Sequence, residues 1–175
     1  MVLVPIVTLL TRGSIFGWAS APLDSEWVMR NPRKAAWVSL AGPASNFLLC
    51  ILATILMFVG VKTGVFTPRF LYGTGITSTV IVSGTGPWEL CAMIVNILFS
   101  LNLLLGVFNL LPLPPLDGAS IPLLWLEGRT AEKYQLFIYQ PQIQLLTFIL
   151  AWQFAGHIIW PVYDKSLDVL QDILT

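Results

Sequence analysis

The sequence predicts an all-α fold, a polytopic bundle of transmembrane helices with a re-entrant or interfacial loop near the N-terminus. Composition is the first reason: hydrophobic residues make up 56% of the 175 residues and charged residues only 10%, with a mean hydropathy of +0.79. A soluble domain has about 25% charged residues. The second reason is that several apolar stretches reach the length of about 20 residues that a bilayer span requires. No internal repeat divides them, so we expect one membrane domain, residues 1–175.

Three apolar stretches are predicted to be full spans, near residues 35–61, 88–111 and 142–162. The first contains no charged residue, the second is uncharged from Leu90 onward, and the third contains one histidine and no formal charge. The opening segment, residues 1–10, is apolar but too short to cross the hydrocarbon core. We therefore expect it to be a partial or partly inserted segment.

Two connecting segments differ in composition. Residues 11–34 mix Gly, Pro, Trp and charged side chains, which is typical of a loop at the membrane interface or one that re-enters the membrane. Irregular backbone at membrane depth must be buried in protein or lie near water. Residues 62–87 are rich in Gly, Thr and Ser, and we expect them to form an external connector with a short strand near 76–82.

The distribution of basic residues predicts an orientation, because Lys and Arg are enriched in cytoplasmic loops. If Arg30, Arg33 and Lys34 are cytoplasmic, three spans place six basic residues inside and three outside. The chain is thus expected to be a multi-pass integral protein of a plasma or inner membrane. The lipid bilayer is its expected surroundings, and a net charge of zero gives no indication of nucleic-acid binding.

A first polar motif, Ala-Gly-Pro-Ala-Ser-Asn at residues 41–46, lies early in the first predicted span. Pro43 frees a backbone carbonyl and is expected to kink the helix, while Gly42 and Ala44 allow close helix approach. Asn46 then offers a hydrogen-bond donor and an acceptor within the bilayer. Two interpretations remain open: a helix-packing seam with a hydrogen-bonding Asn, or the lining of a site.

A second motif, Phe-Asn-Leu-Leu-Pro-Leu-Pro-Pro-Leu-Asp-Gly at residues 108–118, follows the second predicted span. Its prolines, including Pro115, cannot continue a helix, so the chain must break and turn. Asp117 follows, with Gly118 supplying conformational freedom. An ionised carboxylate at this depth is costly unless a cation or polar group compensates it. Either Asp117 binds a metal ion, or it caps a helix that begins near Ala119.

The last predicted span contains His157, which is the only histidine in the chain. It lies near Trp160 and Tyr163, aromatic residues of the kind that gather at the membrane interface. We therefore interpret His157 as an interfacial residue rather than as a zinc ligand.

In order along the chain, the two motifs resemble those of the site-2 protease family of intramembrane zinc metalloproteases. The resemblance implies a Zn²⁺ cofactor, a transmembrane or membrane-proximal protein as substrate, and hydrolysis of a peptide bond in or beside the membrane. In that family the aspartate of the Leu-Asp-Gly motif is a zinc ligand, which implies this role for Asp117. The resemblance likewise implies that Asn109 contacts the substrate or the oxyanion, and that Pro43, Asn46, Pro115 and Gly118 pack near the site.

The chain departs from the family pattern in one respect. The family's zinc-binding helix carries His-Glu-x-x-His, which supplies two zinc ligands and the general base, and a chain with one histidine cannot contain it. Two explanations fit: the zinc-binding helix lies upstream of an internal Met1, or the chain is a non-catalytic relative that binds membrane segments as a scaffold. A small transporter subunit, with Asp117 lining a polar path, is a third possibility.

Overall fold

Helices make up most of the described chain, which comprises residues 24–71, 79–82 and 86–175 of the computed structural model. The predicted partial segment 1–10 and residues 11–23 of the predicted N-terminal loop lie outside the described residues. The chain divides into two compact units, residues 1–30 and 31–175. The first unit contains helix α2 (Ser25–Arg30), in which the exposed side chains of Arg30 and Glu26 form an ion pair at 3.0 Å.

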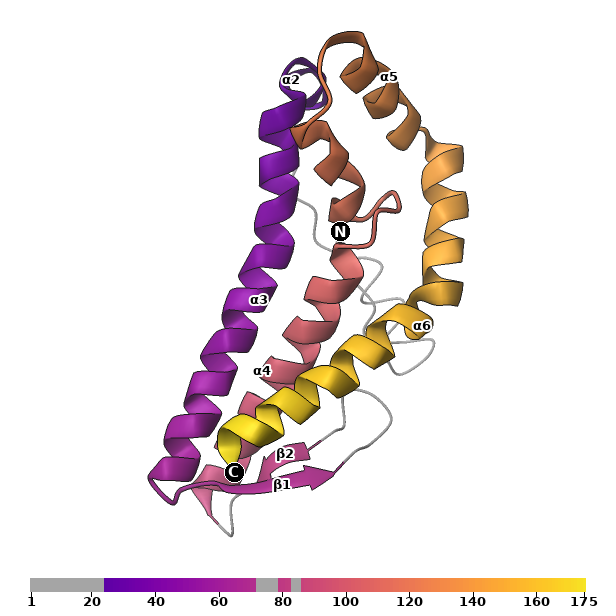
Figure 1. Cartoon of the computed structure of the whole chain (residues 1–175). Helices are drawn as coiled ribbons and strands as arrows, with labels where there is room; N and C mark the ends of the chain where they lie inside the picture. Colours follow the sequence, from indigo (N-terminus) through magenta and orange to yellow (C-terminus); the bar gives the residue numbers. More distant parts are fainter. Residues whose placement is uncertain (1–23, 72–78, 83–85) are drawn as a thin grey trace, which may run out of the picture. The chain divides into compact units, whose positions relative to one another are not determined.

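Three long helices form the framework of the second unit: α3 (Pro32–Lys62), α4 (Pro87–Asn109) and α6 (Pro141–Leu174) (Figure 1). Each has a proline in its first turn, where the missing backbone N–H has no helical partner in any case. Between α4 and α6 lie the 3₁₀ helix η1 (Asp117–Leu124) and helix α5 (Gly128–Ile138). The predicted all-α class is thus confirmed for most of the described chain.

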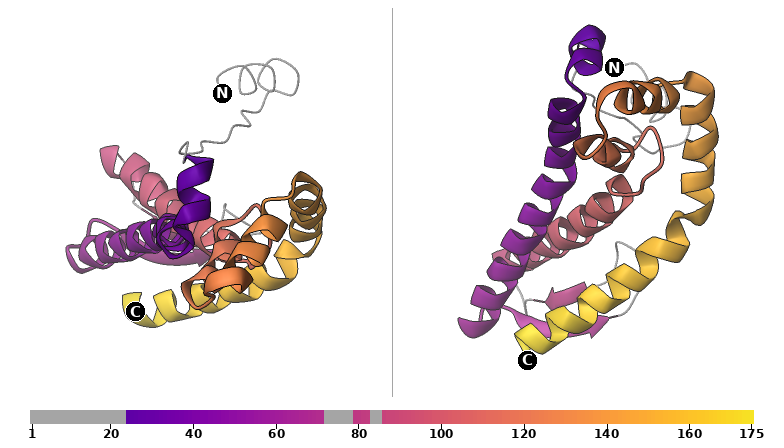
Figure 2. Two further views of the ribbon diagram at one scale, coloured as in Figure 1. Left: turned by 90° about the horizontal axis from the view of Figure 1, so that it is seen from above. Right: turned by 45° about the horizontal axis from the view of Figure 1, so that its top comes forward.

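The helices α3 and α4 are each long and apolar enough to cross a membrane, and they coincide with the first two predicted spans. The third candidate is α6, which bends by 50° between residues 141–151 and 153–174 (Figure 2). Its two parts together pass the same criteria. The described residues therefore contain two candidate spans, or three if bent α6 is one, and α6 runs past the predicted end at residue 162.

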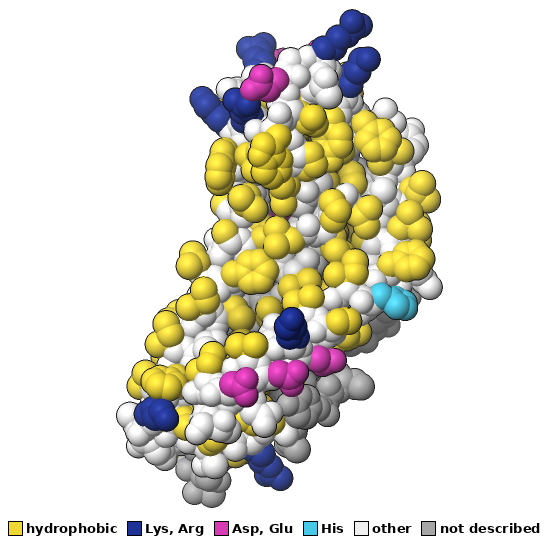
Figure 3. Space-filling model, in the orientation of Figure 1, with side chains coloured by type: hydrophobic (Ala, Val, Ile, Leu, Met, Phe, Trp, Pro, Cys, Tyr) yellow, Lys and Arg dark blue, Asp and Glu magenta, His cyan; other side chains and the backbone are white. Residues whose placement is uncertain are grey.

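The surface of α3 is apolar along most of its length. Only 17% of its most apolar 18-residue window is buried, compared with 44% for α4. Figure 3 shows hydrophobic side chains covering the middle of one face of the molecule. Exposed apolar side chains on α3 include Leu48, Ile51 and Ile55. A surface of this kind is expected to contact lipid, because a soluble monomer rarely exposes so large a continuous apolar area.

A two-stranded antiparallel hairpin connects α3 to α4. It consists of β1 (Thr67–Leu71) and β2 (Thr79–Val82), with Thr67 paired to Val82 and Pro68 to Ile81. The strand predicted near 76–82 overlaps β2, whereas β1 has no counterpart among the sequence predictions. The side chain of Asn96 on α4 holds β2: its Oδ1 accepts from the Val80 and Ile81 amides at 3.1 and 3.2 Å, and its Nδ2 donates to the Ile81 carbonyl at 2.8 Å.

The largest core cluster joins α3, α4, the hairpin and the C-terminal half of α6. It includes Met57, Phe66, Ile81, Phe99 and Leu170, all of them buried. At its centre the hydroxyls of Ser100 and Tyr163 are hydrogen-bonded at 2.8 Å, which links α4 to α6. Burying these two hydroxyls is tolerable because they satisfy each other. The half of the unit that contains this cluster is held together mainly by apolar packing. The two polar motifs, residues 41–46 and 108–118, lie in the other half.

Candidate active site

The two polar motifs meet in the structure at Gly42 and Asp117. A Cβ atom built on Gly42 of α3 would lie 2.9 Å from Oδ2 of Asp117 and 3.8 Å from its carboxyl carbon. The Asp117 carboxylate therefore rests against the bare backbone of α3, in a place that any larger residue at position 42 would occupy. In the sequence, Gly42 indicates only that another helix can approach closely. Its contact with Asp117 is apparent only from the structure.

The segment between α4 and η1 folds back tightly on itself. A Cβ atom at Gly118 would lie 2.3 Å from the carbonyl oxygen of Leu110 and 2.4 Å from that of Leu111. The φ angle of Gly118 is not positive. The conformational freedom that was expected of this glycine is therefore not required at this position. Gly118 is needed for its small size, because backbone approaches it where a side chain would be. This fold-back brings the residue after Asn109 beside the residue after Asp117.

Asp117 is the first residue of η1, and it does not cap that helix. The N-cap position is Leu116, and no side chain caps the helix through a hydrogen bond. The alternative in which Asp117 merely caps a helix beginning near Ala119 is therefore wrong. Among the described residues, no basic side chain forms an ion pair with Asp117 and no donor forms a hydrogen bond to its carboxylate. Burial raises the pKa of the Asp117 carboxyl above its usual range.

The remaining predicted site residues lie on the elements that flank this contact. Pro43 is fully buried beside Gly42. Asn46, one helical turn after Gly42, and Asn109, the last residue of α4, are both half-buried. Pro115 is exposed, whereas the neighbouring Pro114 is buried. Proline at 115 therefore faces outward while 114 contributes the packing.

The polar groups of α4 outside the motif have structural partners. Asn96 holds β2, Ser100 pairs with Tyr163, and Asn102 Nδ2 donates to the Leu98 carbonyl one turn earlier at 2.8 Å. Ser100 thus bonds to another helix, while Asn96 bonds to a strand. None of the three needs a ligand to be satisfied.

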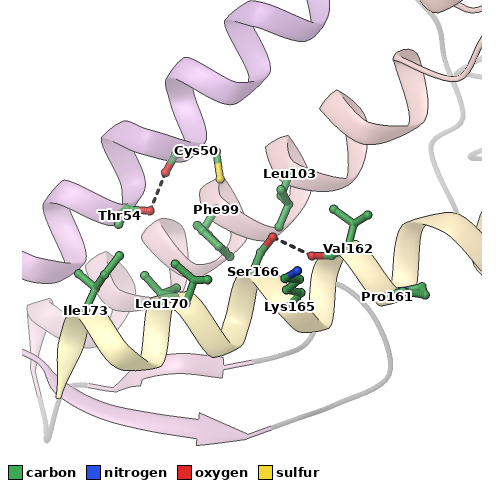
Figure 4. A pocket seen from close by; sticks show the side chains of 11 residues that line it. Cys50, Thr54, Phe99, Leu103, Pro161, Val162, Lys165, Ser166, Leu170 and Ile173 are labelled. Carbon is green, nitrogen blue, oxygen red and sulfur yellow. Dashed lines mark hydrogen bonds between the residues drawn. The ribbon is translucent and has the colours of Figure 1, made fainter.

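A cavity of about 590 Å³ lies apart from the motifs, between α3, α4 and the C-terminal half of α6 (Figure 4). Its lining is almost entirely apolar, with Lys165 as its one charged side chain and with Thr54 and Ser166 bonded to carbonyls of their own helices. It contains no carboxylate or imidazole. The Cys50 thiol and Lys165 are the ionisable groups that the described residues place in its lining, and they do not make up the three protein ligands of a catalytic zinc site.

The described residues do not form a metal-binding site by themselves. Within residues 24–71, 79–82 and 86–175, no three His, Cys, Asp or Glu side chains lie close enough together to hold one. Zinc sites in proteins use three or four protein ligands, and Asp117 offers one. His157 is exposed on α6 beside the ring of Phe154, at a centroid distance of 6.3 Å.

Comparison with known proteins places these features in a family. The family model for peptidase family M50 matches residues 7–150, a range that contains both motifs. "Putative zinc metalloprotease YwhC" of Bacillus subtilis (strain 168) is 28% identical over 171 residues, covering 94% of this chain and 68% of that protein. No solved structure matches the chain. Because the family model covers most of its length, the chain belongs to peptidase family M50, the site-2 protease family of zinc metalloproteases.

Proposed function

We propose that this chain forms the substrate-facing part of a membrane-embedded zinc metalloprotease, which hydrolyses a peptide bond within or beside the membrane. The observation that supports this most directly is the contact between Gly42 and Asp117. Two motifs that are far apart in the sequence meet at a carboxylate that has no basic partner among the described residues. A carboxylate that is partly removed from water needs a positively charged partner. The zinc ion of this family is a suitable one.

Asp117 is proposed as one ligand of a zinc ion. The other two ligands and the general base must come from residues outside the printed sequence, because its single histidine, His157, cannot provide a His-Glu-x-x-His motif. When zinc is bound in such a site, it acidifies a water molecule and polarises the peptide carbonyl. The role of this chain's own residues is to supply the third ligand and to shape the surroundings of the bond.

Asn109 is proposed to contact the substrate or to stabilise the oxyanion that forms during hydrolysis. Its support is its position: it ends α4 immediately before the fold-back that carries Leu110 against Gly118, and the residue is half-buried. Asn46 and Pro43 lie on α3 within about a turn of Gly42. They are proposed to pack beside the site rather than to take part in the chemistry.

The chain is further proposed to be a multi-pass membrane protein with the N-terminus of α3 at the cytoplasmic face. Arg33 and Lys34 at that end of α3 and Arg129 and Lys133 on α5 are exposed, and Figure 3 shows Lys and Arg side chains gathered at this end. This agrees with the enrichment of basic residues on the cytoplasmic side. The substrate would then be a transmembrane or membrane-proximal segment of another protein, and the N-terminal loop would be interfacial or re-entrant.

The proposal is tested on the protein purified, with all its natural segments, from its own membrane. We expect an intact mass above 19.4 kDa, one bound zinc per molecule by plasma mass spectrometry, and cleavage of a reporter bearing one transmembrane helix with an Asn-Pro break. Asp117→Asn should abolish cleavage and weaken zinc retention. Cleavage that survives this change would overturn the assignment of Asp117.

One observation favours a second candidate, a non-catalytic scaffold that binds membrane segments: no metal-binding cluster occurs among the described residues. In that case the native protein would bind no zinc. It would still bind partner proteins normally after Asp117→Ala. The same purification therefore distinguishes the two functions.

A further inference from the structure

The backbone that carries Asp117 has little regular hydrogen bonding of its own. From Leu110 to Ala119 it is held by short-range turns, such as Leu113 N to Leu111 O at 2.8 Å and Ala119 N to Leu116 O at 3.1 Å. Three prolines in this stretch have no N–H to donate, and 3₁₀ hydrogen bonds are weaker in geometry than α-helical ones. A segment of this kind needs contacts from elsewhere in the fold to keep one conformation.

Two hydroxyl groups from the following helices supply such contacts. The Tyr134 hydroxyl on α5 donates to the Ala119 carbonyl at 2.8 Å, and the Thr147 hydroxyl on α6 hydrogen-bonds the Pro114 carbonyl. Thr147 Oγ1 also lies 2.6 Å from the Ile143 carbonyl of its own helix, so its one hydroxyl proton is shared between the two carbonyls. The two carbonyls lie on either side of Asp117 in the sequence. We call Tyr134 and Thr147 the hydroxyl pair.

Apolar packing holds the same helices against the segment. Leu123 of η1 is fully buried with Ala131 and Ile138 of α5 in one cluster, which also includes Ala36 of α3. Leu116 is buried with Ala151 of α6 in another cluster. The segment thus lies between α3 on one side and α5 and α6 on the other. Packing of this kind sets its general location, whereas directed hydrogen bonds to carbonyls fix its orientation.

We propose that Tyr134 and Thr147 are positioning residues, which hold the Asp117 carboxylate in the orientation that places it against Gly42. This inference rests on the proposed function of Asp117 as a ligand in a proteolytic site. Neither residue touches the carboxylate; each acts through a backbone carbonyl near it. A ligand or catalytic group displaced by about 1 Å loses about two orders of magnitude in effect, so small movements of this segment matter.

The test compares Tyr134→Phe and Thr147→Val with Tyr163→Phe in the native full-length protein. Tyr163→Phe is the matched control, because it removes one buried tyrosine hydroxyl bond, to Ser100, in the other half of the unit. All three variants should fold and lose similar stability. We expect Tyr134→Phe and Thr147→Val to lower kcat for the reporter about tenfold with KM nearly unchanged, and to retain less zinc after dialysis against a weak chelator. Thr147→Ser should restore both.

A second readout needs neither zinc nor activity. The variant Gly42→Cys/Asp117→Cys, made together with Cys50→Ser and Cys91→Ser, should form a disulfide under mild oxidation, since the two positions are in contact. Adding Tyr134→Phe should slow this cross-link several-fold, and adding Tyr163→Phe should leave its rate unchanged.

The outcomes separate the two proposals. If Tyr134→Phe and Thr147→Val behave like Tyr163→Phe in kcat, zinc retention and cross-linking, the positioning role is wrong while the zinc protease remains. If Asp117→Asn retains full cleavage, the proposed function fails whatever the hydroxyl pair does. If the hydroxyl variants slow the cross-link but Asp117→Asn is fully active, the segment is positioned but Asp117 is not the ligand, and the inference falls with the proposed function.

Discussion

The carboxylate of Asp117 lies directly against the backbone of Gly42, so closely that a methyl group at position 42 would come within 2.9 Å of its Oδ2 atom. This relationship explains why a glycine precedes Pro43 in the interior of helix α3. Glycine costs about 0.5–1 kcal/mol in a helix interior relative to alanine. Its presence here is accounted for by the space that the aspartate occupies.

Gly42→Ala is expected to displace the Asp117 carboxylate and to lower cleavage of a membrane-helix reporter by about tenfold, equivalent to about 1.4 kcal/mol. The helix itself should be no less stable, since alanine is the better helix former. Gly156→Ala in α6 is the matched control: its Cβ would lie 3.4 Å from Trp160 Nε1, an ordinary contact. Equal activity of the two variants would contradict a site at this contact.

Gly60→Ala is expected to destabilise the fold by about 1–3 kcal/mol through overpacking. Its Cβ would lie 2.0 Å from the buried ring of Phe66, which anchors the start of the hairpin to α3. Thermal unfolding in detergent measures the effect. In the double variant Gly60→Ala/Phe66→Leu the loss should be smaller than the sum of the two single losses; strict additivity would show that the ring and the new methyl group do not meet.

Asn96→Ala is expected to loosen the hairpin, because two amides and one carbonyl of β2 lose their partner in a buried place. Leaving buried backbone groups unsatisfied costs about 1–3 kcal/mol. Hydrogen exchange at Val80 and Ile81 should accelerate. Asn102→Ala in the same helix removes only a bond to the Leu98 carbonyl, so it should leave exchange in the hairpin unchanged; acceleration by both variants alike would count against the role given to Asn96.

Glu127→Gln is expected to change stability by less than about 1 kcal/mol. Its ion pair with Arg33 joins the start of α5 to α3, yet the two side chains are 72% and 56% exposed, where water and salt weaken the attraction. Unfolding temperatures at low and high salt measure the effect. A large loss that salt does not reduce would mean that this pair lies in a less polar environment than its exposure indicates.

Labelling of the two cysteines should differ. Cys91 near the start of α4 is exposed, whereas Cys50 on α3 is buried against the core. A membrane-permeant maleimide should therefore modify Cys91 rapidly and Cys50 only after denaturation, as read by intact mass. Serine variants of each cysteine serve as controls. Rapid modification of Cys50 in the folded protein would contradict the packing of α3 against α4.

The positions of the apolar spans and of the helix break can be predicted from the sequence, because they depend on consecutive residues. A run of apolar residues is a property of consecutive positions, so the first two spans agree with α3 and α4 to within a few residues. Closely spaced prolines cannot continue a helix, so the break after Asn109 was equally predictable, whereas a single proline such as Pro43 lies inside α3. The end of α6 was not predictable, because residues 163–174 carry four charged side chains and hydropathy marks the end of an apolar span rather than the end of a helix. Strand β1 was not predictable either, because its pairing with β2 depends on contacts between separate segments.

The partners of individual side chains were decided by the tertiary structure alone. Hydropathy cannot tell that Asn96 would hold a strand while Ser100 pairs with Tyr163, because both sit in one apolar helix and differ only in what approaches them. Nor does any motif mark Tyr134 or Thr147, whose roles depend on where α5 and α6 pass the proline-rich segment. The sequence alone provides the carboxylate of Asp117 and the helices around it. Its placement against Gly42 arises only when segments distant in the chain pack together, since contact is a property of space and not of sequence order.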